Sequence, residues 1–395
     1  MKTFFSGLFL FILLFQSCAQ NDAGKETTQE NNKTSNTQCD SSKLVASRPQ
    51  VTKSFTLADF LSENKELQDE VETVFKQLSE GQIIAQLIMP AVGKYGQTKE
   101  TIEQHIKAGI IGGVLMLNGT KDEFTGLIKS FEAKNKELGN LPFLYSADAE
   151  PSLVNRKING STLVKKASEI STYDQVVEVT KTISDDLNAI GINYNFAPVV
   201  DVAGNATVGY RGFGSKPEQL IPWSNAFIQE TQKQGIIATA KHFPGHGLVS
   251  GDTHKSLQMI DGELKEIKNY PELIKNGVLS IMVAHIAVQN NAKYNTNGLP
   301  STCSEKIVTD LLRKELGFKG LIVTDAMNMG GVVSVPQSAT KAIQAGCDIV
   351  LMPLDAKKTH VELLAMYKKD ESFRAKVQAA AMNVIRMKIC LGLLK

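Results

Sequence analysis

The stretch GLIVTDAM, Gly320–Met327, decides the fold of this 395-residue chain. Its apolar and β-branched residues run without a polar interruption until Asp325. A continuous run of this kind is typical of a strand that is covered on both faces, as in a parallel sheet. Seven more such runs follow one another along the chain, at Gln86–Pro90, Gly112–Leu117, Leu141–Asp148, Ile192–Val202, Ala238–Phe243, Leu279–Ile286 and Cys347–Pro353.

The segments between these runs carry helix signals. From Tyr173, apolar residues recur at helical spacing until Gly191, which predicts the end of a helix. Ser304 is a candidate N-cap, and the apolar stripe after it ends at Gly317. Eight strand–helix units predict an α/β fold, a single (β/α)8 TIM-type barrel over residues 55–395. An open, doubly wound sheet is the alternative, because periodicity does not show closure.

Polar side chains gather where the predicted strands end. In a barrel the carboxyl ends of the strands form the rim that carries the active site. Five strands that deliver charge or imidazole to one rim favour a catalytic role over a structural one. The residues are Asp148, Asp201, Lys241 with His242, His285, and Asp325.

The N-terminus differs in composition from the rest of the chain. Lys2 precedes the apolar run Phe4–Phe15, which is too short to span a bilayer and is typical of a secretory signal peptide. Cys18 follows and resembles the lipobox cysteine of bacterial lipoproteins. We therefore predict that residues 1–18 are a lipoprotein-type signal peptide, and that the exported protein is anchored to the membrane by lipid on this cysteine. The two residues before Ser17 depart from the lipobox pattern, so ordinary cleavage after Ala19 is the alternative.

Composition sets further limits. Residues 19–54 are rich in polar side chains and are predicted to be a disordered linker. The formal net charge of +2 gives no large basic field and therefore argues against a nucleic-acid partner. Three cysteines, Cys303, Cys347 and Cys390, lie in apolar-patterned segments without metal-ligand spacing, and we predict that they are small core residues.

The sequence KHFPGHGLVSGDTH, Lys241–His254, is the richest in ionisable side chains, with three histidines, one aspartate and one lysine. Asp252 and His254 are two residues apart, so an extended loop would place both on one side. There the carboxylate can hold the imidazole in one tautomer and stabilise its charged form. This arrangement favours a general acid/base histidine on a loop.

This loop has two other interpretations. His242 and His246 are four residues apart, which suggests a metal site. That spacing pairs ligands only on a helix, and Pro244 with Gly245 argues against a helix here. The remaining interpretation is a loop of structural histidines, which the density of imidazole and charge disfavours. We predict neither a metal nor a cofactor.

Asp325 is ambiguous when it is taken alone. A carboxylate at the end of a buried strand is costly unless it has a partner or a function. It is also a common N-cap for the helix that follows. The residues around it do not decide between the two.

Together the two motifs resemble those of glycoside hydrolase family 3, in its β-N-acetylglucosaminidase branch, whose loop reads KHFPGHG and then, four residues later, Asp-x-His. The resemblance covers Leu57–Leu393 and implies a retaining glycosidase that releases terminal β-linked N-acetylglucosamine. It implies that Asp325 is the nucleophile and His254 the acid/base, with Asp252 as its partner. It also implies sugar contacts by Asp148, Arg156, Arg211, Lys241 and His242.

One segment departs from the family pattern. The chain has DAEPSLVNR at Asp148–Arg156 where the family usually has DQEGGRVQR, so that both glycines and the first arginine are replaced. This loop shapes one wall of the sugar pocket, and the leaving group, in a peptidoglycan fragment or a chito-oligosaccharide, stays open. Phosphorolysis of the same linkage is an alternative, since a neutral imidazole does not repel an anionic acceptor. A non-catalytic carbohydrate-binding lipoprotein is the alternative of a different class.

Overall fold

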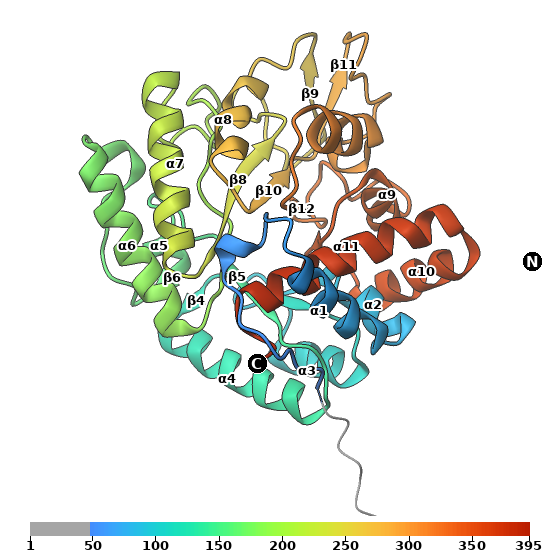
Figure 1. Ribbon diagram of the computed structural model, residues 1–395. Helices are drawn as coiled ribbons and strands as arrows, with labels where there is room; N and C mark the ends of the chain where they lie inside the picture. Colours follow the sequence, from blue (N-terminus) through green and yellow to red (C-terminus); the bar gives the residue numbers. More distant parts are fainter. Residues whose placement is uncertain (1–47) are drawn as a thin grey trace, which may run out of the picture. The chain divides into compact units, whose positions relative to one another are not determined.

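The computed structural model describes residues 48–395, and each of the eight predicted apolar runs contains a strand (Figure 1). A short further strand, β2 (Ala91–Val92), follows the first of them. The eight are β1 (Ile88–Met89), β3 (Gly113–Met116), β5 (Leu144–Ala147), β7 (Tyr194–Asn195), β8 (Ile237–Phe243), β10 (Ser280–Val283), β12 (Leu321–Thr324) and β13 (Val350–Leu351).

The strands form a curled parallel sheet. Seven of them pair in the order β12-β10-β8-β7-β5-β3-β2, and β1 pairs with β13. Within residues 48–395 this order follows the sequence without a reversal, whereas a doubly wound sheet reverses its order at a switch point. The open, doubly wound alternative is therefore wrong.

Backbone hydrogen bonds connect the β1–β13 pair to both neighbours. On one side, the amide of Thr324 in β12 donates to the carbonyl of Ile349 (3.0 Å), and within the pair the amide of Val350 donates to the carbonyl of Leu87 (2.7 Å). On the other side, the amide of Gly112 donates to Ile88 (3.0 Å). The ladder therefore continues from β12 through the pair to the start of β3.

Side chains meet on the concave face of the sheet. The hydroxyl of Tyr194 on β7 lies 2.6 Å from that of Ser280 on β10, although β8 separates these two strands. Both residues are fully buried, among large apolar side chains such as Phe196 and Met282. The curl therefore encloses a packed interior.

Helices cover the outer face, as the alternation of strands and helices predicts (Figure 1). Short pieces, α5 (Val154–Lys157), β4 (Gly119–Thr120), β6 (Ile158–Asn159), β9 (Gln258–Asp261) and β11 (Ile286–Gln289), decorate the connections. The longer helices are α1 (Lys65–Lys76), α2 (Glu80–Ala85), α3 (Lys99–Ala108), α4 (Lys121–Glu137), α6 (Tyr173–Ile190), α7 (Pro217–Lys233), α8 (Tyr270–Lys275), η5 (Lys306–Glu315), α9 (Ser338–Ala345), α10 (Ala356–Lys369) and α11 (Glu371–Cys390).

Local signals predicted the ends of these helices unevenly. Helix α6 ends where expected, because Gly191 takes the left-handed conformation (φ 97°) that closes it. The cap predicted at Ser304 is present in the backbone but not in the side chain. Ser304 is extended (φ −111°, ψ 113°), and its carbonyl accepts from the amides of Ile307 and Val308 at the start of η5, where no side-chain capping bond is made.

The N-terminal predictions fall largely outside the described residues. The signal peptide over residues 1–18, the lipidation site Cys18 and the linker up to residue 47 belong to that part of the chain. Residues 48–54, which were assigned to the linker, contact the domain instead. Arg48 donates to the carbonyl of Asn140 (2.6 Å) and pairs with Glu132 (2.8 Å). Composition missed these contacts because one arginine suffices to make them.

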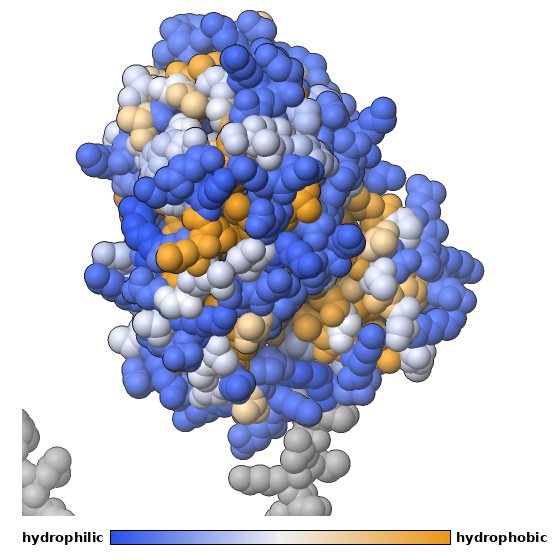
Figure 2. All heavy atoms as spheres, turned by 90° about the vertical axis from the view of Figure 1, so that its left-hand side faces the viewer, coloured by the Kyte–Doolittle hydropathy of each residue, from blue (hydrophilic) through white to orange (hydrophobic). Residues whose placement is uncertain are grey.

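The outer surface and the interior differ in polarity. Figure 2 shows that the face carrying α6 and α7 is mainly hydrophilic, with hydrophobic patches in hollows between blue side chains. Cys303, Cys347 and Cys390 are free and buried, which confirms that they are core residues. None of the described helices is long and apolar enough to cross a membrane.

Candidate active site

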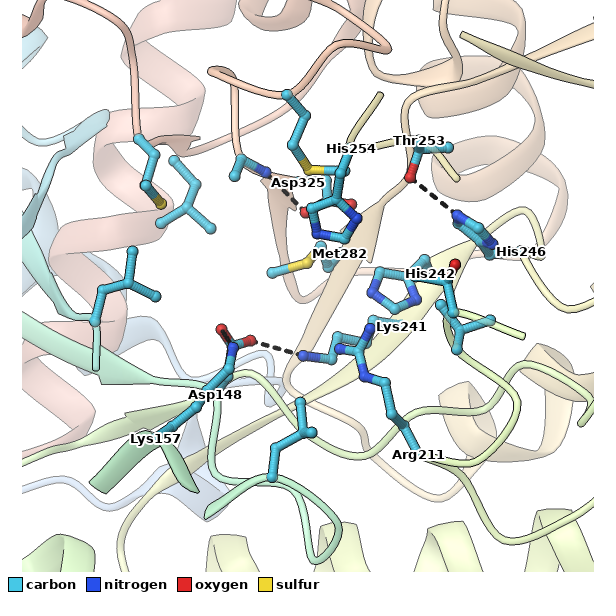
Figure 3. A pocket seen from close by; sticks show the side chains of 18 of the residues that line it. Asp148, Lys157, Arg211, Lys241, His242, His246, Thr253, His254, Met282 and Asp325 are labelled. Carbon is cyan, nitrogen blue, oxygen red and sulfur yellow. Dashed lines mark hydrogen bonds and ion pairs between the residues drawn. The ribbon is translucent and has the colours of Figure 1, made fainter. Parts of the chain in front are cut away.

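A cavity of about 440 Å³ opens at the carboxyl ends of the strands (Figure 3). The chain reaches it from the segments that follow β5, β7, β8 and β12. Apolar side chains, including Leu117, Leu153 and Met352, form part of its wall. The predicted site residues that line it are Asp148, Arg156, Arg211, Lys241, His242, His254 and Asp325.

Asp148, directly after β5, is held between two lysines. Its carboxylate accepts from Lys241 (2.8 Å) and from Lys157 (2.6 Å). Burial alone would raise the pKa of Asp148, but the charges of the two lysines outweigh it and hold this pKa well below its usual range. Asp148 is therefore an ionised acceptor that is fixed in orientation and faces the cavity.

Glu150 lies beneath this pair and is fully buried. Arg211 donates to both of its oxygens (2.8 and 2.5 Å), and Lys241 lies 2.6 Å from one of them. Burial raises the pKa of Glu150, yet the charges of Arg211 and Lys241 bring it down to about 2. The same pairing raises the pKa of Arg211 against its own burial. Two carboxylates and three cations thus form one network under the cavity.

A β-bulge lets Lys241 and His242 both face the cavity. Adjacent residues on a regular strand point to opposite faces. Here the pairing between β8 and β10 shifts register, since Met282 pairs with Lys241 and Val283 with Phe243. The irregular strand end that the sequence required for this pair is present.

Asp201, after β7, supports His242 from behind. Its carboxylate lies 2.6 Å from Nδ1 of His242 and accepts from the backbone amide of His246 (2.7 Å). Burial raises the pKa of Asp201, but the charge of His242 outweighs it and lowers the pKa. This carboxylate holds the His242 ring through Nδ1, and Nε2 takes no part in that contact.

The loop after β8 carries the predicted acid/base pair. Nδ1 of His254 lies 2.7 Å from the Asp252 carboxylate, which also accepts from the His254 amide (3.0 Å). The His254 side chain is 59% exposed, and its Nε2 has no hydrogen-bond partner within residues 48–395. Burial raises the pKa of Asp252, but its bonds to His254 lower it overall. The pairing expected from the sequence is therefore present.

Asp325 lines the same cavity as His254 (Figure 3). It is half-buried, its amide continues the ladder by donating to Val283 (2.9 Å), and its carboxylate accepts from the Ala326 amide (2.8 Å). Burial raises its pKa, but the charges of His242 and then His285 outweigh it and leave the pKa of Asp325 lowered. The carboxylate is therefore ionised at neutral pH.

His285, after β10, holds the segment that follows Asp325. It is fully buried, and its ring lies 3.0 Å from the carbonyl of Ala326 and 2.8 Å from the hydroxyl of Thr302. Burial lowers the pKa of His285. Of the six rim residues expected from the sequence, His285 and Asp201 thus support the site from beneath, and the other four line it.

The structure brings the predicted residues together and adds two. Arg156 lies at the edge of the cavity and is exposed. Glu150 and Lys157 were not among the predicted site residues, although both contact members of the set. Within residues 48–395, no group of three or more His, Cys, Asp or Glu side chains is arranged to hold a metal ion.

Comparison with known proteins gives one family. The family model described as the glycosyl hydrolase family 3 N terminal domain matches residues 81–387. The chain is 33% identical over 248 residues to Beta-hexosaminidase A of Pseudoalteromonas piscicida, a match that covers 56% of this chain and 42% of that protein. It is 32% identical over 260 residues to Beta-hexosaminidase of Tolumonas auensis, covering 61% of this chain and 75% of that one.

A solved structure agrees with these matches. The glycoside hydrolase family 3 β-N-acetylglucosaminidase from Paenibacillus sp. str. FPU-7 superimposes with a TM-score of 0.72 at 27% identity. The superposition covers 80% of this chain and 63% of that one. The chain thus spans less than two thirds of the Pseudoalteromonas and Paenibacillus proteins.

Proposed function

Because this chain belongs to glycosyl hydrolase family 3, we propose that it is a retaining glycosidase that releases terminal β-linked N-acetylglucosamine. The observation that carries the proposal is the meeting of two groups in one cavity. Asp325 is an ionised carboxylate, and His254 is an imidazole that a carboxylate orients. A retaining glycosidase needs a nucleophile and a proton donor in this relation. The names of the related hexosaminidases support the choice of sugar.

The reaction proceeds in two steps. Asp325 attacks the anomeric carbon, and the bond to the leaving oxygen breaks as His254 donates its Nε2 proton to that oxygen. Water then attacks the anomeric carbon of the glycosyl-aspartate, and His254 takes a proton from it. This releases the sugar with its original anomeric configuration and restores Asp325. Asp252 stabilises the charged imidazole before the first step and again after the second, while the imidazole is neutral in the glycosyl-aspartate between them.

We assign sugar binding to the charged network under the cavity and to His242. Asp148, Lys241 and His242 present fixed donors and acceptors for hydroxyl groups, and Arg211 stands beside them. Because each is already held by a partner, little side-chain freedom is lost when the sugar binds. The apolar wall at Leu117, Leu153 and Met352 suits the methyl of an acetamido group. We expect Arg156, which is exposed at the edge of the cavity, to contact the rest of a peptidoglycan fragment or chito-oligosaccharide.

An aryl N-acetyl-β-glucosaminide tests the proposal. The wild-type protein should release the phenol and free N-acetylglucosamine, with phosphate present or absent, whereas a phosphorolytic enzyme would yield the sugar 1-phosphate. Asp325→Ala should abolish turnover because the nucleophile is gone. Asp122→Ala, a change at an exposed carboxylate in the first turn of α4, serves as the control. An inactive wild-type protein, or one that binds sugar without turnover, would contradict the proposal.

We also propose export and a lipid anchor at Cys18. The apolar run and the cysteine after it support this. Wild-type protein expressed in a bacterium should partition into a detergent phase, and Cys18→Ala should move to the aqueous phase. A Cys18→Ala protein that stays with the membrane would argue against lipidation.

For the fold, we propose that the curled sheet closes as a (β/α)8 barrel. The hydrogen bonds of the β1–β13 pair to β12 and to the start of β3 support closure, as does the contact of Tyr194 with Ser280 across the interior.

A further inference from the structure

We propose that Gly330 and Gly331 are positioning residues that fasten the His254 loop to the segment carrying Asp325. The inference rests on the proposed function, because it assigns these glycines to the alignment of the acid/base with the nucleophile. They follow the nucleophile by five and six residues. They act through their backbone and touch neither substrate nor the reacting atoms.

Two hydrogen bonds make the connection. The amide of Gly330 donates to the carbonyl of His254, and the amide of Gly331 donates to the carbonyl of Thr253, each at 2.9 Å. Consecutive carbonyls of the acid/base loop are thus bound by consecutive amides. Two adjacent bonds restrict the backbone of His254 more than one would, because rotation about either bond breaks the other.

Close approach, and not backbone conformation, requires glycine at these positions. Neither residue has a positive φ. A Cβ on Gly330 would overlap the carbonyl of Lys255 and lie 2.9 Å from the His254 oxygen. A Cβ on Gly331 would lie 3.0 Å from His285 and 3.1 Å from the Thr253 oxygen. Any side chain at 330 therefore pushes against the main chain of the acid/base loop.

The segment that carries Asp325 is itself held in place by buried contacts. The buried ring of His285 lies 3.0 Å from the carbonyl of Ala326, and Val332, which follows the two glycines, is completely buried. The segment is therefore held on both sides of Gly330 and Gly331.

The loop that carries His254 is also held by other contacts, so Gly330 and Gly331 control only the part of it around His254. The Thr253 hydroxyl lies 2.9 Å from Nε2 of buried His246. The side chain of Asn205 donates to the carbonyls of Val249 (2.6 Å) and Gly251 (2.9 Å). The Asn205 contacts fix the loop before Asp252, and the His246 contact holds the Thr253 side chain. The backbone that carries the exposed imidazole of His254 is held by the two bonds from Gly330 and Gly331.

Gly330→Ala tests the inference with two substrates. The leaving group of a 2,4-dinitrophenyl glycoside departs without being protonated, whereas that of a phenyl glycoside needs the proton that His254 donates. Displacing His254 should lower kcat/KM for the phenyl substrate about 100-fold, since a misplacement of about 1 Å costs roughly that factor. The dinitrophenyl substrate should lose less than about 10-fold, because general acid catalysis contributes little to its cleavage. Azide, which needs no general base, should restore kcat on the dinitrophenyl substrate.

Gly331→Ala should show the same selectivity with a smaller loss, because its Cβ contacts are less severe. Gly126→Ala is the matched control, since a Cβ there meets nothing within 4 Å in an exposed position of α4. Equal losses on both substrates, or none, would overturn the inference, as would a fall in melting temperature with unchanged selectivity.

A measurement on the wild-type protein needs neither folded variants nor activity. By hydrogen exchange, amides in the peptide 329–332 should exchange much more slowly than those of the exposed turn at Asn297–Gly298. Fast exchange at 329–332 would refute the connection even in an active enzyme. Slow exchange in an inactive protein would instead separate failure of the proposed function from failure of this inference.

Discussion

Glu150→Gln tests the charge network beneath the cavity. Glu150 is fully buried and faces two cations, Arg211 at 2.8 Å and Lys241 at 2.6 Å. Glutamine keeps the shape of the side chain and removes its negative charge. Both buried cations then lose a counter-charge, which is costly because charges in the interior are poorly solvated.

The magnitude follows from the pKa of Glu150. Against its burial, the charges of Arg211 and Lys241 lower this pKa from 4.5 to about 2. The difference corresponds to about 3 kcal/mol of unfolding free energy at neutral pH, since one pKa unit is worth about 1.36 kcal/mol. Breaking a buried ion pair costs about 3–5 kcal/mol, a range that includes this value. We therefore expect the variant to lose about 3 kcal/mol at pH 7.

The pH dependence has a definite sign. The pKa of Glu150 is lower in the folded protein than in the unfolded chain, so its stabilisation is complete above pH 4.5. The stabilisation is lost as the pH falls toward about 2. The difference between wild type and variant should therefore be constant from pH 7 to pH 5 and shrink below that.

Urea unfolding followed by the fluorescence of Trp223, the single tryptophan, measures this free energy. Glu178→Gln, at an exposed position of α6, is the control and should change stability by less than about 0.5 kcal/mol. The reasoning is refuted if Glu150→Gln loses no more than this control at pH 7. It is also refuted if the loss grows as the pH falls below 4.5.

Three further changes address the reaction. His285→Gln removes a positive charge that lowers the pKa of Asp325, so the acidic limb of kcat/KM should move to higher pH; an unmoved limb would contradict this. Lys157→Met leaves Asp148 with one lysine, so KM should rise about 10-fold with a smaller change in kcat, in steady-state kinetics. Asp252→Asn should lower kcat/KM for a phenyl glycoside about 100-fold, because an amide can bind the wrong imidazole tautomer, and equal losses on activated substrates would argue otherwise.

The strands were predictable because of how they are buried. GLIVTDAM gives β12, since a strand between two layers needs apolar residues on both faces, and that requirement is local in sequence. The end of the run also located Asp325, because the first polar residue after a buried strand lies at the rim. The pairing of Asp252 with His254 was predictable for a similar reason, as the two are separated by one residue.

The network beneath the cavity was not predictable in this way. Glu150 and Arg211 are 61 residues apart, and Asp148 and Lys241 are 93 apart. No periodicity connects such pairs, because the curvature of the sheet brings them together. Resemblance to a family indicated some of the members, but it gave no partner for any of them. At Ser304 the sequence located the start of the helix but not the capping atom, since the backbone carbonyl accepts from the amides of Ile307 and Val308.

The altered segment Asp148–Arg156 can now be interpreted through its contacts. Leu153 stands where the family usually has an arginine, so the segment has one cation fewer than the family pattern. Lys157, at the end of α5, lies 2.6 Å from the Asp148 carboxylate and supplies a positive charge there. Charge around Asp148 is therefore balanced without the arginine. Asp148 lines the cavity together with the apolar Leu153 and the exposed Arg156, which belong to the altered segment. Under the proposed function, we therefore expect the departure to affect the choice of leaving group more than the binding of the sugar.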